Sequence, residues 1–127
     1  MYEIIFYETA GGVSELWNYL DDLRRKAKNN KNARIQHNQI VQYIQLLEDH
    51  GTRLGEKITK HLEEDIWELR PGRNRVLFFY QNSNTYVLLH GFVKKTQKTP
   101  RREIEKAKRE RDDWKKRMGK NENVERL

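Results

Sequence analysis

Three segments rich in β-forming residues follow one another closely and constrain the fold more than any other feature of this chain. They are LEEDIWELR (62–70), RNRVLFFYQ (73–81) and TYVLLHGFVKK (85–95), separated by the short sequences PG and NSN. Proline, glycine and asparagine are typical turn residues, and connections this short join antiparallel strands. The pattern predicts an antiparallel meander of three strands, which needs other elements to cover its apolar side chains.

The rest of the chain predicts those covering elements. A short strand is expected over 2–8, and apolar residues recur at helical spacing over 14–27 and 33–50. A last helix is expected over 99–119, with Thr99 as N-cap, Pro100 in the first turn and Gly119 as its stop.

The expected order is therefore β-α-α-β-β-β-α, which is an α+β fold. We expect a single domain over residues 1–118 and a flexible tail over 119–127. The two N-terminal helices should cover one face of the sheet. The other face should stay largely open, because the last helix has only a thin apolar stripe.

Positive charge is concentrated near the C-terminus. The formal net charge is +7, yet residues 94–120 alone hold 13 Lys/Arg and 5 Asp/Glu, a balance of +8. Such a surface suits a polyanion or an acidic protein, and a solvated helix of mixed charge explains it equally well.

Composition also bears on the compartment. The chain has no cysteine, which excludes disulfides and thiol ligands and fits a cytoplasmic protein. No apolar window approaches the length of a membrane span, and the N-terminus lacks a secretory signal pattern. We expect a cytoplasmic protein with no membrane partner.

Arginines gather at the first turn of the meander. Arg70 and Arg73 flank this turn and should lie side by side, and Arg75 shares a strand face with Arg73. Like charges placed together cost free energy, so one interpretation is an anion site in which guanidinium groups grip phosphate oxygens. The alternative is a solvated hairpin tip whose arginines pair with Glu64 or Glu68.

The third strand carries His90 and ends in Lys94 and Lys95. Regular alternation places Leu88, His90 and Lys94 on one face. A histidine in an apolar strand is more often a hydrogen-bonded core residue than a catalyst, and both interpretations stay open here.

Sequence motifs for metal or cofactor chemistry are absent. There is no HExxH, GxSxG or Gly-rich phosphate loop, and the acids of 63–68 form no cluster with histidine at ligand spacing. A reaction on a phosphodiester would then use Arg and Lys, with no metal or cofactor. It needs an internal nucleophile, which the 2′-hydroxyl of RNA provides. One group removes the 2′-OH proton, another protonates the leaving 5′-oxygen, and fixed cations stabilise the phosphorane.

Two segments resemble a known family. WELRPGRNRVLFFY (67–80) and LLHGFVKKTQKTPRREIEKA (88–107), with the predicted element order, resemble the RelE/HigB toxins of bacterial type II toxin–antitoxin modules, and most closely the HigB-like branch that also occurs in phages. The resemblance implies two helices packed on a twisted antiparallel sheet. It also implies metal-independent endoribonuclease activity on mRNA in the ribosomal A site.

The resemblance further implies partners and site residues. The expected partner is an antitoxin, typically a helix-turn-helix DNA-binding protein. The two proteins should form a heteromeric complex, which binds operator DNA only through the antitoxin. Family arginines fall on Arg70 and Arg75, and the cationic strand end falls on Lys94 and Lys95. The expected catalytic residues are Arg70, Arg73, Arg75, His90, Lys94 and Lys95, and the expected RNA-binding residues are Lys57, Lys60, His61, Lys98, Arg101 and Arg102.

The family pattern is incomplete, which keeps other functions open. The positions of the RelE lysine pair hold Ile66 and Glu68, and Trp114 is the aromatic nearest to the family's C-terminal tyrosine. One alternative is a non-enzymatic toxin of the ParE kind that inhibits DNA gyrase. Another is a basic nucleic-acid-binding module without catalysis.

Overall fold

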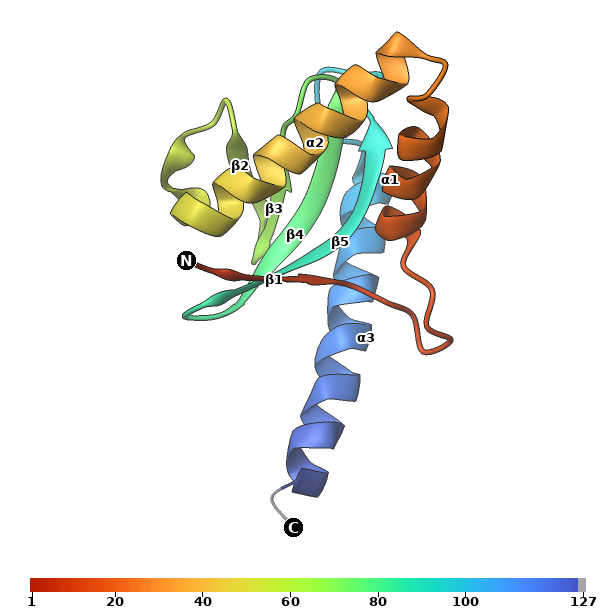
Figure 1. Ribbon diagram of the computed structural model, residues 1–127. Coiled ribbons are helices and arrows are strands. Elements are labelled where there is room, and N and C mark those ends of the chain that lie inside the picture. Colours follow the sequence, from red (N-terminus) through yellow and green to blue (C-terminus); the bar gives the residue numbers. More distant parts are fainter. Residues whose placement is uncertain (126–127) are drawn as a thin grey trace.

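A five-stranded sheet with helices on both faces forms the α+β fold of this chain, seen in a computed structural model that describes residues 1–125, with side chains described to Met118 (Figure 1). The strand order is β1-β5-β4-β3-β2. The strands are β1 (Glu3–Phe6), β2 (Thr59–Glu63), β3 (Ile66–Leu69), β4 (Asn74–Asn82) and β5 (Thr85–Val93). β1 pairs with β5 in parallel, and the other pairings are antiparallel, which confirms the meander as β3-β4-β5.

Residues 62–70 form parts of two strands, so the prediction of one strand there is wrong. The chain turns at Glu64 and Asp65, where Glu64 has a φ of 53°, and β2 folds back on β3. Asp65 is a common turn residue, but the surrounding alternation over 62–70 favours one continuous strand. The side chains of Glu64 and Asp65 are also held by Arg111 of the last helix.

The helices α1 (Glu15–Lys26) and α2 (Lys31–His50) cover one face of the sheet, as predicted (Figure 1). Each begins at a side-chain cap. Ser14 Oγ accepts from the N–H of Trp17 at 3.1 Å, and Asn30 Oδ1 accepts from the N–H of Ala33 at 3.0 Å. Their apolar faces pack on the strands in a core that includes Leu16, Leu20, Ile40, Leu47, Val76, Phe78 and Leu88.

The end of α2 depends on a glycine. Gly51 has a φ of 66°, and a Cβ at this position would lie 2.9 Å from the ring of Tyr2. Gly51 therefore ends α2, and a short 3₁₀ helix, η1 (Gly51–Leu54), leads toward β2.

The opposite face is covered by α3 (Arg101–Glu125), so the expectation of a largely open face is wrong (Figure 1). Ala107 and Trp114 are buried against Leu77 and Phe79, and the ring centroids of Trp114 and Phe79 lie 5.8 Å apart. A thin apolar stripe suffices because Trp114 buries a large area and because ion pairs extend the contact. None of the helices in the described part of the chain is both long and apolar enough to span a bilayer.

The last helix also ends later than predicted. It continues past Gly119 to Glu125, so the stop at Gly119 is wrong. Residues 126–127 of the expected flexible tail lie outside the described residues. The domain boundaries 1–118 stay a prediction.

A β-bulge in β5 changes which way its side chains point. Leu77 pairs with His90 and Phe78 pairs with Leu88, so one extra residue sits in β5. Leu88 packs in the core under α1 and α2, whereas Leu89 belongs to the core under α3. The side chain of His90 also meets α3. The expected shared face of Leu88 and His90 is therefore wrong.

A basic cleft at one end of the sheet

Four of the expected catalytic residues line one pocket, where β4 begins and β5 ends. Its volume is about 630 Å³, and its lining residues are Gly72, Arg73, Arg75, Lys94, Lys95, Thr96 and Gln97. The N–H of Lys94 donates to the carbonyl oxygen of Arg73 at 2.7 Å. Strand pairing therefore holds the two basic segments against each other.

Arg75 is the buried cation of this pocket, with 6% of its surface exposed. Its Nη1 donates to the carbonyl oxygens of Gly72 and Asn74, both at 2.8 Å. Burial lowers the pKa of the Arg75 guanidinium, the nearby Glu68 carboxylate raises it, and Arg70 adds to the lowering. The side chain is thus fixed in place before any ligand arrives, which is the condition for preorganised charge stabilisation.

Glu68 connects the arginines behind the pocket. It is 2% exposed, and its Oε2 lies 3.3 Å from Arg70 Nε and 3.8 Å from Arg75 Nε. Its Oε1 accepts from the hydroxyl of Thr99 at 2.5 Å. Thr99 was predicted as the N-cap of the last helix and instead contributes its hydroxyl here. A buried carboxylate between two arginines explains how they lie close together without a bound anion.

Arg70 takes a different direction from Arg73. Its Nη1 donates to the carbonyl oxygen of Glu56 at 2.7 Å, and Arg70 is not among the residues that line the basic pocket. Arg73 is exposed at the pocket wall. Although the two arginines flank one turn, only Arg73 is available to a ligand in this pocket.

His90 is a buried connection between β5 and α3, with 1% of its surface exposed. Its Nδ1 lies 2.5 Å from Glu110 Oε1 and its Nε2 lies 3.1 Å from Glu103 Oε1. A neutral imidazole donates only one N–H, so two hydrogen bonds to these groups require an imidazolium or a protonated carboxyl. His90 is separated from solvent, and any effect on a ligand passes through its glutamate neighbours.

A second pocket of about 560 Å³ adjoins the first. It is lined by Phe92, Val93, Lys95, Thr96, Pro100, Arg102 and Glu103. Lys95 and Thr96 line both pockets, so we call the two together the basic cleft. The first turn of α3 thereby joins the ends of β4 and β5 in one concave surface. Glu103 is the one carboxylate among its lining residues.

The other expected RNA-binding residues lie around or away from the cleft. Lys98 is exposed in the link before α3, and Arg101 pairs with Glu63 and Glu105. Three further candidates are exposed in the edge strand β2 or the turn before it, outside the lining of the cleft: Lys57, Lys60 and His61.

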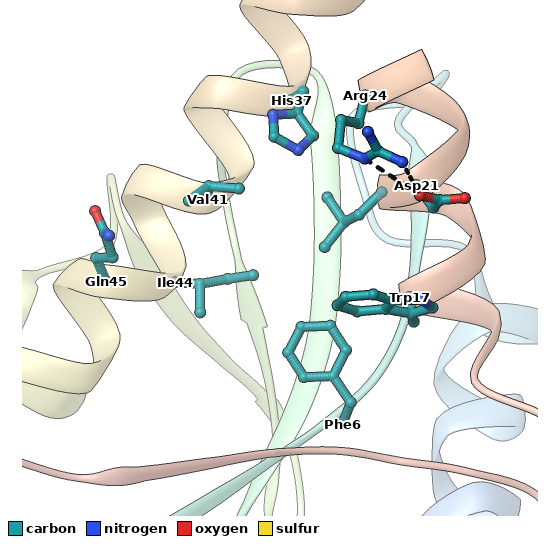
Figure 2. A pocket seen from close by; sticks show the side chains of 9 residues that line it. Phe6, Trp17, Asp21, Arg24, His37, Val41, Ile44 and Gln45 are labelled. Atoms are coloured by element: carbon teal, nitrogen blue, oxygen red, sulfur yellow. Dashed lines mark hydrogen bonds and ion pairs between the residues drawn. The ribbon is translucent and has the colours of Figure 1, made fainter. Parts of the chain in front are cut away.

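A separate apolar groove of about 220 Å³ lies between α1 and α2 (Figure 2). Phe6, Trp17 and Ile44 line it, and the ion pair of Asp21 with Arg24, 2.8 Å apart, lies at its edge. Trp17 is 62% exposed. Most of its lining is apolar and Arg24 is already paired with Asp21, so the groove suits an apolar side chain better than a phosphate.

The described residues contain no group of three or more His, Asp or Glu placed to hold a metal ion. The guanidinium and ammonium groups of the Arg and Lys residues that line the cleft are suited to phosphate oxygens.

Comparison with known proteins gives a family for the chain. The family model described as phage derived protein Gp49-like (DUF891) matches residues 19–112, which include every residue that lines the cleft. Among solved structures, the YoeB dimer from Staphylococcus aureus is similar with 15% sequence identity and a TM-score of 0.44. That match covers 75% of this chain and 97% of the YoeB chain. No curated protein matches.

Proposed function

Because the chain belongs to the phage-derived Gp49-like family, and because its cleft gathers Arg and Lys side chains, we propose that it is the toxin of a type II toxin–antitoxin module. Its activity in this proposal is metal-independent cleavage of mRNA. The observation that carries the proposal is the meeting of Arg73, Arg75, Lys94 and Lys95 in one pocket. The resemblance of segments 67–80 and 88–107 to RelE/HigB toxins supports it.

The cleft supplies the electrostatic part of such a reaction. Attack of a 2′-oxygen on the neighbouring phosphorus adds negative charge to the phosphoryl oxygens. Arg75 offers a guanidinium fixed by hydrogen bonds, and Arg73 and Lys94 offer less buried cations at the pocket wall. Lys95, which lines both pockets, is placed to donate a proton to the leaving 5′-oxygen.

The substrate in this proposal is mRNA on the ribosome. Lys98 and Arg102 present positive charge beside the cleft, and such groups bind the RNA backbone through salt-sensitive contacts. The resemblance to HigB-like toxins also supports mRNA on the ribosome as the substrate, and a cytoplasmic location for the protein.

A cognate antitoxin completes the proposal, and by the same resemblance it is a helix-turn-helix DNA-binding protein. The exposed Trp17 and the apolar groove beside it support a protein partner, because apolar surface of this kind commonly marks an interface. Binding of operator DNA belongs to the antitoxin. Co-purification of the product of the neighbouring gene tests this point.

Induced expression in bacteria, followed by primer extension on abundant mRNAs, tests the function. The proposal predicts growth arrest with discrete mRNA cleavages, and relief of both by Arg75→Ala in a folded protein. A DNA-damage response with intact mRNA would indicate a gyrase inhibitor. Retention of RNA without cleavage or toxicity would indicate a binding module.

A further inference from the structure

The residues that line the cleft include several cations and one carboxylate, that of Glu103. A carboxylate can accept a proton, which the cations of the cleft cannot. We propose that Glu103 is the general base of the cleft, which takes the proton from the attacking 2′-hydroxyl, and that His90 and Glu110 position it. This inference rests on the proposed ribonuclease function and adds a catalytic residue to it.

The contacts of Glu103 leave one of its oxygens available. Its side chain is 17% exposed and lines the part of the cleft that also holds Lys95 and Arg102. Oε1 faces His90 Nε2 at 3.1 Å. Among the described residues the carboxylate has no other hydrogen bond or ion pair. A base needs this combination of a fixed orientation and a free lone pair.

Glu68 is the competing carboxylate, and its contacts argue against that role. Both of its oxygens are engaged, Oε1 by the Thr99 hydroxyl and Oε2 by the guanidinium groups of Arg70 and Arg75. It is almost completely buried and is absent from the lining of both pockets. A 2′-hydroxyl in the cleft would meet Glu103 first.

His90 and Glu110 form the support behind Glu103. Glu110 holds Nδ1 of the imidazole at 2.5 Å, and the imidazole in turn holds Glu103 through Nε2. The β-bulge at Leu89 turns His90 toward α3, so this chain of contacts exists only because the strand departs from regular alternation. The contacts run from Glu110 through His90 to Glu103. Such a row of acid, histidine and acid fixes the orientation of the His90 ring and the direction of the Glu103 carboxylate.

The reaction balances within the cleft. The 2′-O–H bond breaks and its proton passes to Glu103, while the O2′–P bond forms. The P–O5′ bond then breaks, and the 5′-oxygen takes a proton from the ammonium group of Lys95. The products are a 2′,3′-cyclic phosphate and a 5′-hydroxyl, and proton exchange with solvent restores both side chains.

The test is single-turnover cleavage of a defined mRNA bound to purified ribosomes, with the full-length chain. Glu103→Gln keeps the shape and a hydrogen bond to His90 but removes the base, so cleavage should fall by about a hundredfold or more. Folding by circular dichroism and binding of a short RNA should stay at parental levels. Glu105→Gln is the matched control, because it removes the same charge from the same helix outside the cleft.

Glu103→Ala gives a second readout that a purely structural role would not produce. Added formate should restore part of its cleavage by filling the space with a small carboxylate, and should leave the rate of Arg75→Ala unchanged. The inference is overturned if the parent cleaves and Glu103→Gln cleaves within about threefold of it, or if formate has no effect on Glu103→Ala. If the parent does not cleave RNA at all, the proposed function is overturned and the inference with it.

Discussion

Arg75 and Glu68 lie side by side behind the basic cleft, with Arg75 Nε 3.8 Å from Glu68 Oε2. Glu68 also meets Arg70 and Thr99, so one buried carboxylate joins two strands and the link before α3. The guanidinium of Arg75 is thereby desolvated and oriented in the free protein. A phosphate that enters the cleft meets a cation that needs no rearrangement, which is how charge stabilisation becomes effective in a site.

Removal of the Glu68 charge tests this arrangement. Glu68→Gln leaves buried Arg75 and half-buried Arg70 without a countercharge, so the free energy of unfolding should fall by about 3 kcal/mol. Denaturation in urea measures it, with exposed Glu56→Gln as control. Inorganic phosphate should stabilise the variant more than the parent, because the anion replaces the lost charge. Equal stability of variant and parent would contradict the role given to Glu68.

Lys94 should contribute to affinity through a phosphate contact. For a single-stranded RNA oligonucleotide, each such contact adds about 0.7 to the slope of log affinity against log salt. The Lys94→Ala variant should therefore bind the oligonucleotide more weakly at low salt. The steepness of its salt dependence should be smaller than that of the parent by about 0.7. Lys116→Ala, on a distant part of α3, should keep the parental slope. An unchanged slope for Lys94→Ala would place the RNA elsewhere.

His90 should matter first for stability, because it is buried between two glutamates. His90→Ala opens a cavity and leaves Glu103 and Glu110 without their partner, so the free energy of unfolding should fall by about 3 kcal/mol. Any protein that stays folded should also cleave more slowly, because Glu103 loses the contact that orients it. His37→Ala is the control, because His37 is a half-buried histidine on the surface of α2. This substitution should change the free energy of unfolding little. A His90→Ala protein that is as stable as the parent would contradict this account.

The attachment of α3 should weaken in acid. Hydrogen bonds from Arg101 and Lys108 lower the pKa of Glu63 from 4.5 to about 2. A lowered folded-state pKa means that the contribution of Glu63 is complete above pH 4.5 and is lost as the pH falls toward about 2. The difference in unfolding free energy between the parent and Glu63→Gln should narrow over this range. A difference that is independent of pH would show that these ion pairs do not stabilise the fold.

Regular alternation and turn residues predicted much of the fold. Val76 and Phe78 pack on one side of β4 while Leu77 and Phe79 pack on the other, as the alternation of the strand requires. The meander, the two N-terminal helices and the α+β class followed from such local signals. The turn after Glu63 was missed, because Asp65 is a single weak turn signal there and contacts with Arg111, far along the chain, also stabilise it.

In the candidate site, too, the residues marked by local sequence signals were predicted and those that depend on distant contacts were not. Four cations of the cleft were found from their places at the ends of neighbouring strands. Glu103 was missed because its role depends on a bulge in β5 that brings His90 to α3, and the sequence carries no local mark of that bulge. Pairing of the arginines with Glu68 was one of the alternatives open from the sequence, and the structure shows it for Arg70 and Arg75.

The chemistry of the RNA ends tests the central claim most directly. A defined mRNA on purified ribosomes is incubated with the parent, Arg75→Ala or Arg53→Ala, the last of which changes an exposed arginine beside Asn84, outside the cleft. A metal chelator is added after assembly, at a level that leaves the ribosomes intact. We predict fragments with 2′,3′-cyclic phosphate and 5′-hydroxyl ends from the parent and Arg53→Ala, and cleavage slower by about a hundredfold to a thousandfold with Arg75→Ala. Intact mRNA, or fragments with 3′-hydroxyl ends, would contradict the claim.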